Sequence, residues 1–593
     1  MLVRLRMLLA LIGCYIIFGF AASLLIPPWQ SPDEPAHFEH AMLIPYGTDA
    51  ELPAVQQPIL DSFTAFQFYR FRGYTVPETA PTSFSSIDYL MIRQVNKTPL
   101  YYQLASFAAS WTKNTVLQLY SMRWLSVMLS AITIPLAFAL AREVLPESRA
   151  RLALLAAAVV ALLPMYGYIG ASVNPDTLGT PLAAATALFA VRAVRGKQTL
   201  LSVVTMLALA GLSIWSRRSA VALAPWAGLL AGALGVRWAW AHLAKPVVII
   251  SGTCLLLLAL AGAAWPSQLA ADWYPGTGTT VSRSSVHPYE GNDAFTLLAP
   301  GNVTQQFMRY QLSDLHGGQV RIQAAVRGNQ PGASGALVLS DQHGTLATLP
   351  VTPTTNWQMV GFTARVPTSA ESVYLSLRAT IGSVGFDAIS ATHLDPDWPV
   401  VLGNPGAEVP FTWWQTRALT NSFVDYTTRI LQSLRMGMYT SDTARSLYPW
   451  QIEQMTSSFI GRFGWMAFGP AQWVLTAIRL LAVLLVAGYV RVWWGKRRLE
   501  RNQSQAVFWL GLLVVLCVVT PLLEYIPYLS YAMFPQGRYL FPCITPLAAL
   551  LVGGLAQWIP ARFDRGSLAG GIGVLLVFNL WCWFGLIVPY FYA

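Results

Sequence analysis

Long apolar segments separated by short polar stretches dominate this chain. About 11 of them match the roughly 20 residues that a helix needs to cross a bilayer. They lie near residues 7–26, 121–143, 151–169, 177–195, 199–216, 219–237, 246–265, 472–492, 506–525, 539–557 and 568–588. The pattern predicts a polytopic α-helical membrane protein with about 11 transmembrane helices.

The pattern changes between the seventh and eighth apolar segments. Within about 275–396, short alternating runs are separated by Gly, Pro and Asn, as in GALVLS, QMVGFTARV and SVYLSLRA. Strand-length runs of this kind predict an inserted all-β sandwich. We therefore expect a transmembrane module at 1–266 with a large external loop at 27–120. An extracytoplasmic region should follow at 267–470, and the remaining transmembrane helices at 471–593.

Composition excludes several classes of protein. Only 11% of the residues are charged, against roughly 25% in a soluble domain, and 54% are hydrophobic. The five cysteines all lie in apolar segments, so they indicate neither a disulfide framework nor a metal knuckle. The net charge of +11 is not gathered on a soluble domain, which argues against a nucleic-acid partner. It favours basic loops that face anionic lipid.

The basic residues also predict an orientation. With a cytoplasmic N-terminus, the cytoplasmic loops carry most of the Lys and Arg, as the positive-inside rule requires. We interpret 7–26 as an uncleaved first helix, because it is longer than the apolar core of a signal peptide and no small-residue cleavage site precedes Pro27. We therefore expect a multi-pass protein of the inner (plasma) membrane with its active site on the periplasmic or extracellular face. This topology leaves Arg217 and Arg218 outside, against the rule.

The stretch PPWQSPDEPAHFEHA (27–41) places titratable groups beside the bilayer, directly after the first apolar segment. Asp33 and Glu34 could act as a general base, which must lie within hydrogen-bond reach of the hydroxyl that it deprotonates. They could also cap the helix that follows. His37 and His40 share a helix face with Glu34, and this spacing suits a divalent metal. Histidines that only form hydrogen bonds are the alternative, and His37 and His40 are candidate substrate contacts. A metal is therefore one option, and no cofactor is certain.

Basic residues form a second group of candidates on the predicted outer side. They suggest an anionic ligand at the membrane face, because Arg matches phosphate with its planar fork and Lys acts as a point charge. The alternative for each is an interaction with lipid headgroups. The candidates are Lys97, Arg217, Arg218, Arg462 and Arg538.

Several polar and aromatic residues near these groups are candidate substrate contacts. Asp176 in SVNPDTL begins a predicted helix, so it could cap that helix or contact the substrate. Tyr101 and Tyr102 could stack on a sugar or lie in the aromatic belt of the membrane. Gln536 and Tyr539 flank Arg538 in QGRYL and are expected to contact the same ligand.

The order of these motifs resembles a bacterial membrane-protein family, that of domain of unknown function 2142. The motifs are SPDEPAHF, TPLYY, VNPD, a basic pair, SFIGRFGW and QGRYL followed by Pro542. That family is similar to the GT-C superfamily, glycosyltransferases that use polyprenyl-phosphate sugars. The resemblance covers about 1–266 and 455–593. The β-rich insert resembles the carbohydrate-binding jelly roll of actinobacterial arabinofuranosyltransferases.

The resemblance implies roles for particular residues. Asp33 corresponds to the catalytic base, with Glu34 as a supporting or rival candidate. Lys97, Arg218 and Arg538 correspond to the residues that hold the lipid phosphate. This chain has Lys97-Thr98 where family members often have a second proline, and Arg217-Arg218 where many have Lys.

The implied function is transfer of a sugar from a polyprenyl-phosphate donor to a cell-envelope glycan or glycolipid acceptor, with inversion. The chain contains no Gly-rich phosphate loop after a strand, which favours a lipid-linked donor over a nucleotide sugar. Three alternatives remain: a ligase or polymerase that uses a polyprenyl-diphosphate donor, a glycolipid flippase, and a structural glycan-binding protein.

Overall fold

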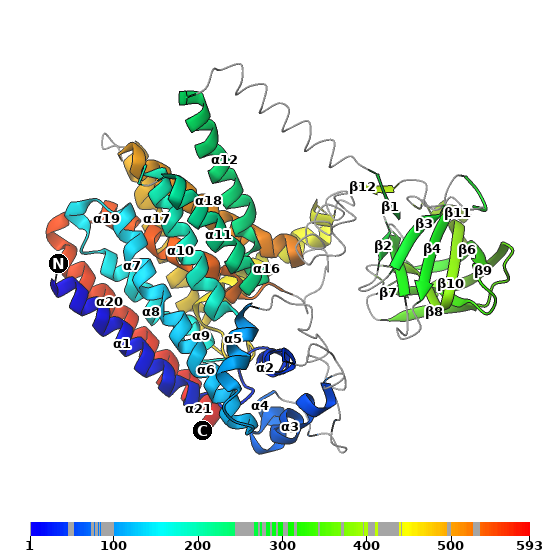
Figure 1. Cartoon of the computed structure of the whole chain (residues 1–593), viewed down its shortest axis with the longest axis horizontal. Helices are drawn as coiled ribbons and strands as arrows, with labels where there is room; N and C mark the ends of the chain where they lie inside the picture. Colours follow the sequence, from blue (N-terminus) through cyan, green and yellow to red (C-terminus); the bar gives the residue numbers. More distant parts are fainter. Residues whose placement is uncertain are drawn as a thin grey trace. The chain divides into compact units, whose positions relative to one another are not determined.

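The computed structural model divides the chain into two compact units, Met1–Ala244 with Ser433–Ala593, and Lys245–Gln432. Apart from a few single residues, it describes 2–45, 52–72, 100–197, 199–242, 266–270, 273–275, 280–284, 288–291, 294–299, 306–312, 317–341, 344–368, 373–394, 397–400, 410–412, 438–440, 442–494, 500–525 and 534–592. The first unit is helical and the second is built from strands (Figure 1).

Nine helices among the described residues are long and apolar enough to cross a membrane, and a bent pair, α8–α9, makes a tenth such segment. The prediction of a polytopic helical membrane protein is therefore confirmed. The expected segment at 246–265 lies outside the described residues. The elements of these segments are α1 (Leu2–Leu25), α6 (Thr115–Ala131), α7 (Thr133–Val144), α8 (Ala153–Leu162), α9 (Pro164–Gly170), α10 (Asp176–Val194), α11 (Thr199–Ser216), η5 (Arg218–Ala222), α12 (Leu223–His242), α17 (Gln472–Trp494), α18 (Arg501–Tyr525), η8 (Gly537–Cys543), α19 (Ile544–Trp558), η9 (Ala561–Phe563), α20 (Asp564–Cys582), η10 (Trp583–Ile587) and α21 (Val588–Tyr592).

The segment expected at 151–169 is not one straight helix. It bends by 59° between α8 and α9. Leu163 is extended (ψ 114°) and Pro164 opens α9. Proline has no backbone N–H to continue the hydrogen bonds of α8, and its ring excludes the preceding residue from the helical region.

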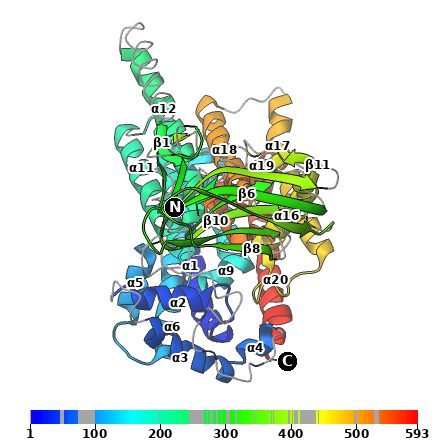
Figure 2. The same cartoon turned by 90° about the vertical axis from the view of Figure 1, so that its right-hand side faces the viewer.

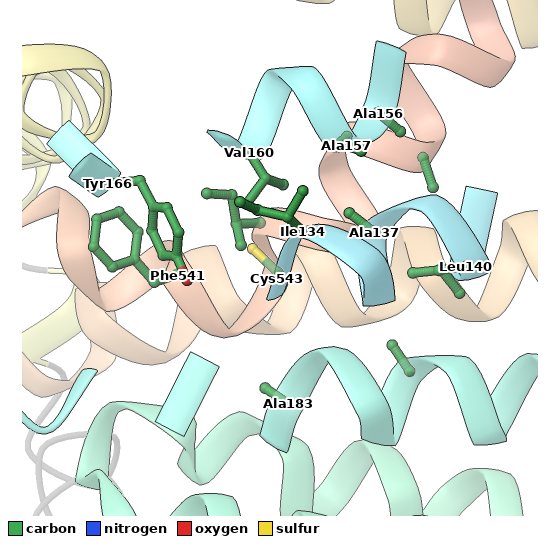
Figure 3. Packing of buried hydrophobic residues seen from close by; sticks show 14 of the residues in the cluster. Ile134, Ala137, Leu140, Ala156, Ala157, Val160, Tyr166, Ala183, Phe541 and Cys543 are labelled. Atoms are coloured by element: carbon green, nitrogen blue, oxygen red, sulfur yellow. The ribbon is translucent and has the colours of Figure 1, made fainter. Parts of the chain in front are cut away.

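Small side chains let the central helices pack closely. Ala137 of α7, Ala156 and Ala157 of α8 and Ala183 of α10 are fully buried around the larger Ile134 (Figure 3). Helices in a bilayer gain little from the hydrophobic effect between them, so close packing of small residues supplies much of their association. The contact of α17 with α19 shows the same principle, because a Cβ on Gly554 would overlap the backbone of Leu485.

The short helices that precede α6 gather at one end of the helical unit (Figures 1 and 2). They are α2 (Glu34–Leu43), α3 (Leu52–Ala65), α4 (Phe68–Arg72) and α5 (Leu100–Ala109). The connections of the opposite end carry basic side chains in ion pairs, such as Arg149 with Asp564 (2.7 Å) and Lys197 with Glu143 (2.8 Å).

The last described helix, α21, lies beside the end of α1, where the Tyr592 hydroxyl donates to the Leu25 carbonyl (3.1 Å).

The second unit is all-β, as predicted. Its long strand β10 (Val373–Leu394) belongs to two sets of antiparallel strands. Its first part pairs with β5 and β7, and its second part pairs with β4 and β6; Gly382, with φ 68°, lies between the two parts. The strands are β1 (Pro266–Ala270), β2 (Tyr274–Pro275), β3 (Thr280–Ser284), β4 (Ala294–Ala299), β5 (Gln306–Leu312), β6 (Gly318–Gly328), β7 (Ser334–Asp341), β8 (Thr345–Val351), β9 (Gln358–Val366), β11 (Asp397–Val400) and β12 (Pro410–Thr412).

Alternation of apolar and polar residues explains the core of this unit. Every second residue of β10 from Val373 to Ala379 is fully buried, with Leu375 and Leu377 between them. Because successive strand residues point to opposite faces, this spacing directs one face of the strand inward. Trp273 and residues of β4, β6 and β7 complete the core.

Candidate functional site

Five segments meet at the end of the helical unit that holds α2 and α5. They are the turn at 26–33, the first turn of α10, Arg217 before η5, the start of η8, and α16 (Asp442–Gly461). Helix α10 contacts both η5 and η8, and α16 packs against η8. Residues far apart in the sequence are thereby brought together around Asp33.

Glu34 and Arg123 form a fully buried ion pair. Arg123 donates from Nε to Glu34 Oε1 (2.8 Å) and from Nη2 to Oε2 (2.6 Å). The same guanidinium donates to the carbonyls of Ser23 and Ile26 (both 2.7 Å) and Pro27 (3.1 Å). These are carbonyls at and just after the end of α1, which the helix cannot satisfy itself. Arg123, in α6, therefore holds the turn at 26–33 and Glu34 against the end of α1.

Glu34 also accepts two backbone N–H groups, from Trp29 and Val173 (both 3.1 Å). Each carboxylate oxygen thus holds two donors, and the side chain is fully buried. We infer that Glu34 organises the loop and does not take a proton from the acceptor. Sequence reasoning missed Arg123, although a lone Arg inside an apolar segment is the signal that points to a buried partner.

Asp33 lies next to this pair but in a different environment. Its carboxylate is 30% exposed and accepts from Nη2 of Arg538, which is 1% exposed. Asp33 precedes α2 with φ 60°, and its side chain makes no cap hydrogen bond. The capping alternative is therefore wrong for Asp33. Its carboxylate is turned instead toward the start of η8.

Asp176 and Arg217 form a second pair. Arg217 Nε lies 2.9 Å from Asp176 Oδ1, and both side chains are largely buried. Asp176 is the first residue of α10, directly after the N-cap residue Pro175. The guanidinium carbons of Arg217 and Arg538 lie 5.7 and 5.8 Å from the centre of the Tyr539 ring. Two cations, each paired with a carboxylate, thus lie over one aromatic ring.

Several polar atoms in this region are buried without a hydrogen-bond partner among the described residues. They include Arg538 Nε, Asp176 Oδ2 and Asn174 Nδ2. A buried polar group without a partner costs about 1–3 kcal/mol, so native proteins retain few unless a ligand or water completes them. The unused hydrogen-bonding capacity surrounds the two Asp–Arg pairs.

The tyrosines expected to stack on a ligand are fully buried. Tyr101 accepts from the Asn174 N–H (3.0 Å), and Tyr102 bonds Nδ1 of His37 (2.8 Å). Burial raises the pKa of the Tyr102 hydroxyl, and Asp176 and Asp33 add to this effect while Arg217 opposes it. His40 packs edge-on against Tyr102, with ring centres 4.3 Å apart. Neither the sugar-stacking nor the membrane-belt interpretation fits fully buried rings.

The divalent-metal hypothesis finds no cluster among the described residues. No three His, Cys, Asp or Glu side chains there lie close enough together to hold an ion. Glu34 is occupied by Arg123, and His37 faces Tyr102.

The other predicted residues differ in their positions. Lys97 lies outside the described residues. Arg218 lies 3.7 Å from Glu524, and both are about one-third exposed. Arg462 is in the connection between α16 and α17. Gln536 precedes η8 and accepts the Tyr539 N–H through its carbonyl (3.0 Å). Arg217, rather than Arg218, joins the site.

Backbone strain concentrates at two loops that touch. Trp29 and Asp33 in the first loop, and Trp465 and Met466 before α17, all have φ between 60° and 73°. The Trp465 indole N–H donates to the Trp29 carbonyl (3.3 Å). Non-glycine residues rarely adopt such φ values, and those that do cluster at functional sites.

Gly537 positions the start of η8, which carries Arg538. Its N–H donates to Ser458 Oγ (2.7 Å), and a Cβ there would overlap the backbone of Phe459. We expect Gly537→Ala to push η8 off α16 and to cost about 1–3 kcal/mol of unfolding free energy. Thermal unfolding in detergent measures this loss. Gly570→Ala, at a helical glycine with open space around it, is the matched control. An unchanged melting temperature for Gly537→Ala would contradict the tight contact.

One family model matches part of the chain. Residues 96–265 match the family described as dolichyl-phosphate-mannose-protein mannosyltransferase. This range contains Arg123, Asp176 and Arg217 but not Asp33 or Arg538. The match covers less than half of the chain and supports the resemblance to membrane glycosyltransferases of the GT-C type. No curated protein matches the chain in a sequence search.

Carbohydrate-binding modules are among the solved structures that match part of the chain. The xylan-binding CBM22-1 domain of Paenibacillus barcinonensis Xyn10C is 15% identical over 24% of this chain and 94% of its own, with a TM-score of 0.19. TmCBM61, in complex with β-1,4-galactotriose, is 15% identical over 21% and 91%, with a TM-score of 0.18. The tailspike protein 4 of bacteriophage CBA120 is 12% identical over 22% and 20%, with a TM-score of 0.18, so the match spans a fifth of its length.

Proposed function

We propose that the protein transfers a sugar from a polyprenyl-phosphate donor to a cell-envelope glycan or glycolipid acceptor on the extracytoplasmic side of the plasma membrane. One observation carries the proposal: the partly exposed carboxylate of Asp33 lies against the buried guanidinium of Arg538, beside a second cation, Arg217. A base next to two phosphate-binding groups is what such a reaction requires. The family match, whose description names a dolichyl-phosphate sugar, supports the choice of donor class.

The two arginines suit the phosphate of the donor. Arg presents a planar fork that can bind two phosphate oxygens at once, and its charge persists when it is buried. Arg538 still has an unused buried Nε–H. As the donor bond breaks, negative charge on the phosphate grows, so fixed cations stabilise the transition state more than the ground state.

Asp33 is the proposed base. The acceptor hydroxyl attacks the anomeric carbon, and its proton passes to the Asp33 carboxylate. The bond from that carbon to the phosphate oxygen breaks, and its electron pair leaves with polyprenyl phosphate. Attack opposite the leaving group inverts the anomeric centre. Asp33 suits this role better than Glu34, because its carboxylate is 30% exposed whereas Glu34 is fully buried and holds four donors.

We further propose that the second, all-β unit binds the acceptor glycan. In that case its deletion should reduce transfer to polymeric acceptors more than transfer to short ones. Equal losses for both acceptors would contradict this role.

Kinetic analysis of three arginine variants tests the phosphate site. Arg538→Gln and Arg217→Gln should each lower kcat by about 10²-fold, because each removes a fixed donor to the developing charge. Arg218→Gln, next in sequence but paired with Glu524, should change kcat less than tenfold. Initial rates are measured against donor concentration with purified protein in liposomes. Equal effects of Arg217→Gln and Arg218→Gln would contradict the assignment.

A further inference from the structure

The proposed base and the proposed phosphate ligand are bonded to each other in this structure. Asp33 accepts from Arg538, and Arg538 also donates to the Pro32 carbonyl (3.4 Å). In this arrangement Nη2 of Arg538 already donates to a carboxylate and is not available to a phosphate. Neither group is ready for its role until the contact breaks.

We propose that the donor phosphate takes the place of Asp33 on Arg538, so that donor binding itself separates the base from this guanidinium. The donor would then bind before the acceptor hydroxyl can be deprotonated. This inference rests on the proposed function, because it assigns the lipid phosphate to Arg538 and the proton to Asp33.

The geometry of Arg538 favours the exchange. Asp33 engages only Nη2, while the neighbouring Nε is buried without a partner in the described part of the chain. A phosphate can accept from Nε and Nη2 together, and such forked pairs are stronger than single charge-assisted bonds. The anion that replaces Asp33 would thus also supply the missing partner of Nε.

The second pair lacks the same freedom. Asp176 is 2% exposed, against 30% for Asp33. Asp176 is part of α10, whereas Asp33 lies in the turn before α2 with φ 60°. Asp33 is therefore the carboxylate that can move, and Asp176 keeps Arg217 in place.

Binding of undecaprenyl phosphate to Asp33→Asn tests the exchange. If Asp33 competes for Arg538, the variant should bind this lipid about tenfold more tightly than the wild type, because a competing state lowers apparent affinity in proportion to its population. Binding is measured by thermophoresis in detergent, without any sugar or acceptor. Asp61→Asn, at an exposed Asp that bonds Gln57, is the matched control and should bind like the wild type. Equal or weaker binding by Asp33→Asn overturns the inference.

Arg538→Gln separates this inference from the proposed function. Loss of undecaprenyl phosphate binding in Arg538→Gln, with no gain in Asp33→Asn, would retain the phosphate site and overturn the exchange. Wild-type binding by Arg538→Gln would overturn the phosphate site itself, and the exchange with it.

Chemical labelling of the wild type tests the exchange if Asp33→Asn does not fold. Carbodiimide labelling of Asp33, read by mass spectrometry against Asp61, should rise when undecaprenyl phosphate is added, because the carboxylate leaves Arg538. Unchanged or reduced labelling of Asp33 would overturn the exchange.

Discussion

Asp33→Asn should reduce sugar transfer by about 10²–10⁴-fold while the protein remains folded and still binds the donor lipid. Asparagine keeps the size of the side chain but cannot take the proton of the acceptor hydroxyl. Arg538 stays in place, because η8 remains anchored on α16 through Gly537 and Ser458. The rate of transfer of a radiolabelled sugar at saturating donor measures the effect.

The comparison distinguishes an enzyme from its rivals. A flippase or a structural glycan-binding protein needs no base, so its function should hardly change in Asp33→Asn. Asp61→Asn serves again as the control for an Asp-to-Asn change. Wild-type transfer by Asp33→Asn would show that another group is the base.

Arg123→Met should cost about 3–5 kcal/mol of unfolding free energy, the largest stability loss that we expect from a single substitution. It leaves the Glu34 carboxylate charged, fully buried and without its cation. It also strips donors from the Ser23 and Ile26 carbonyls at the end of α1. Thermal or denaturant unfolding in detergent measures the loss.

A double-mutant cycle with Glu34→Gln attributes the effect to the pair. The Arg123→Met/Glu34→Gln protein should lose clearly less stability than the two single losses added together, because no buried charge remains unpaired. Lys197→Met breaks an exposed pair with Glu143 and should cost less than about 1 kcal/mol. Additive losses for Arg123 and Glu34 would contradict the coupling.

The membrane architecture could be predicted from the sequence because it depends on local properties. Segment length and apolarity identify a spanning helix without knowledge of its neighbours. Ten described segments lie where the pattern of apolar residues places them, and only the bend at Pro164 was missed. The all-β unit could be predicted for the same reason, since the alternation of apolar and polar residues in segments such as β9 and β10 is a local pattern.

The pairing of charges could not be predicted, because it depends on contacts between distant segments. Glu34 and Arg123 are 89 residues apart, and Asp33 and Arg538 are 505 apart. In the sequence, Asp33 and Glu34 are equally good candidates for the base. The fold buries Glu34 against Arg123 of α6 and leaves Asp33 partly exposed. The same holds for Arg217 and Arg218, which are adjacent in sequence but turn to different carboxylates.

The most direct test of the central claim is transfer by the purified protein in liposomes. A panel of radiolabelled polyprenyl-phosphate sugars is offered with cell-envelope glycan, and wild type, Asp33→Asn and Arg538→Gln are compared. We expect the wild type to transfer label from at least one monophosphate donor and both variants to transfer it at least about 10²-fold more slowly. Absence of transfer from every such donor, with transfer from a polyprenyl-diphosphate glycan instead, would contradict the account and favour the ligase.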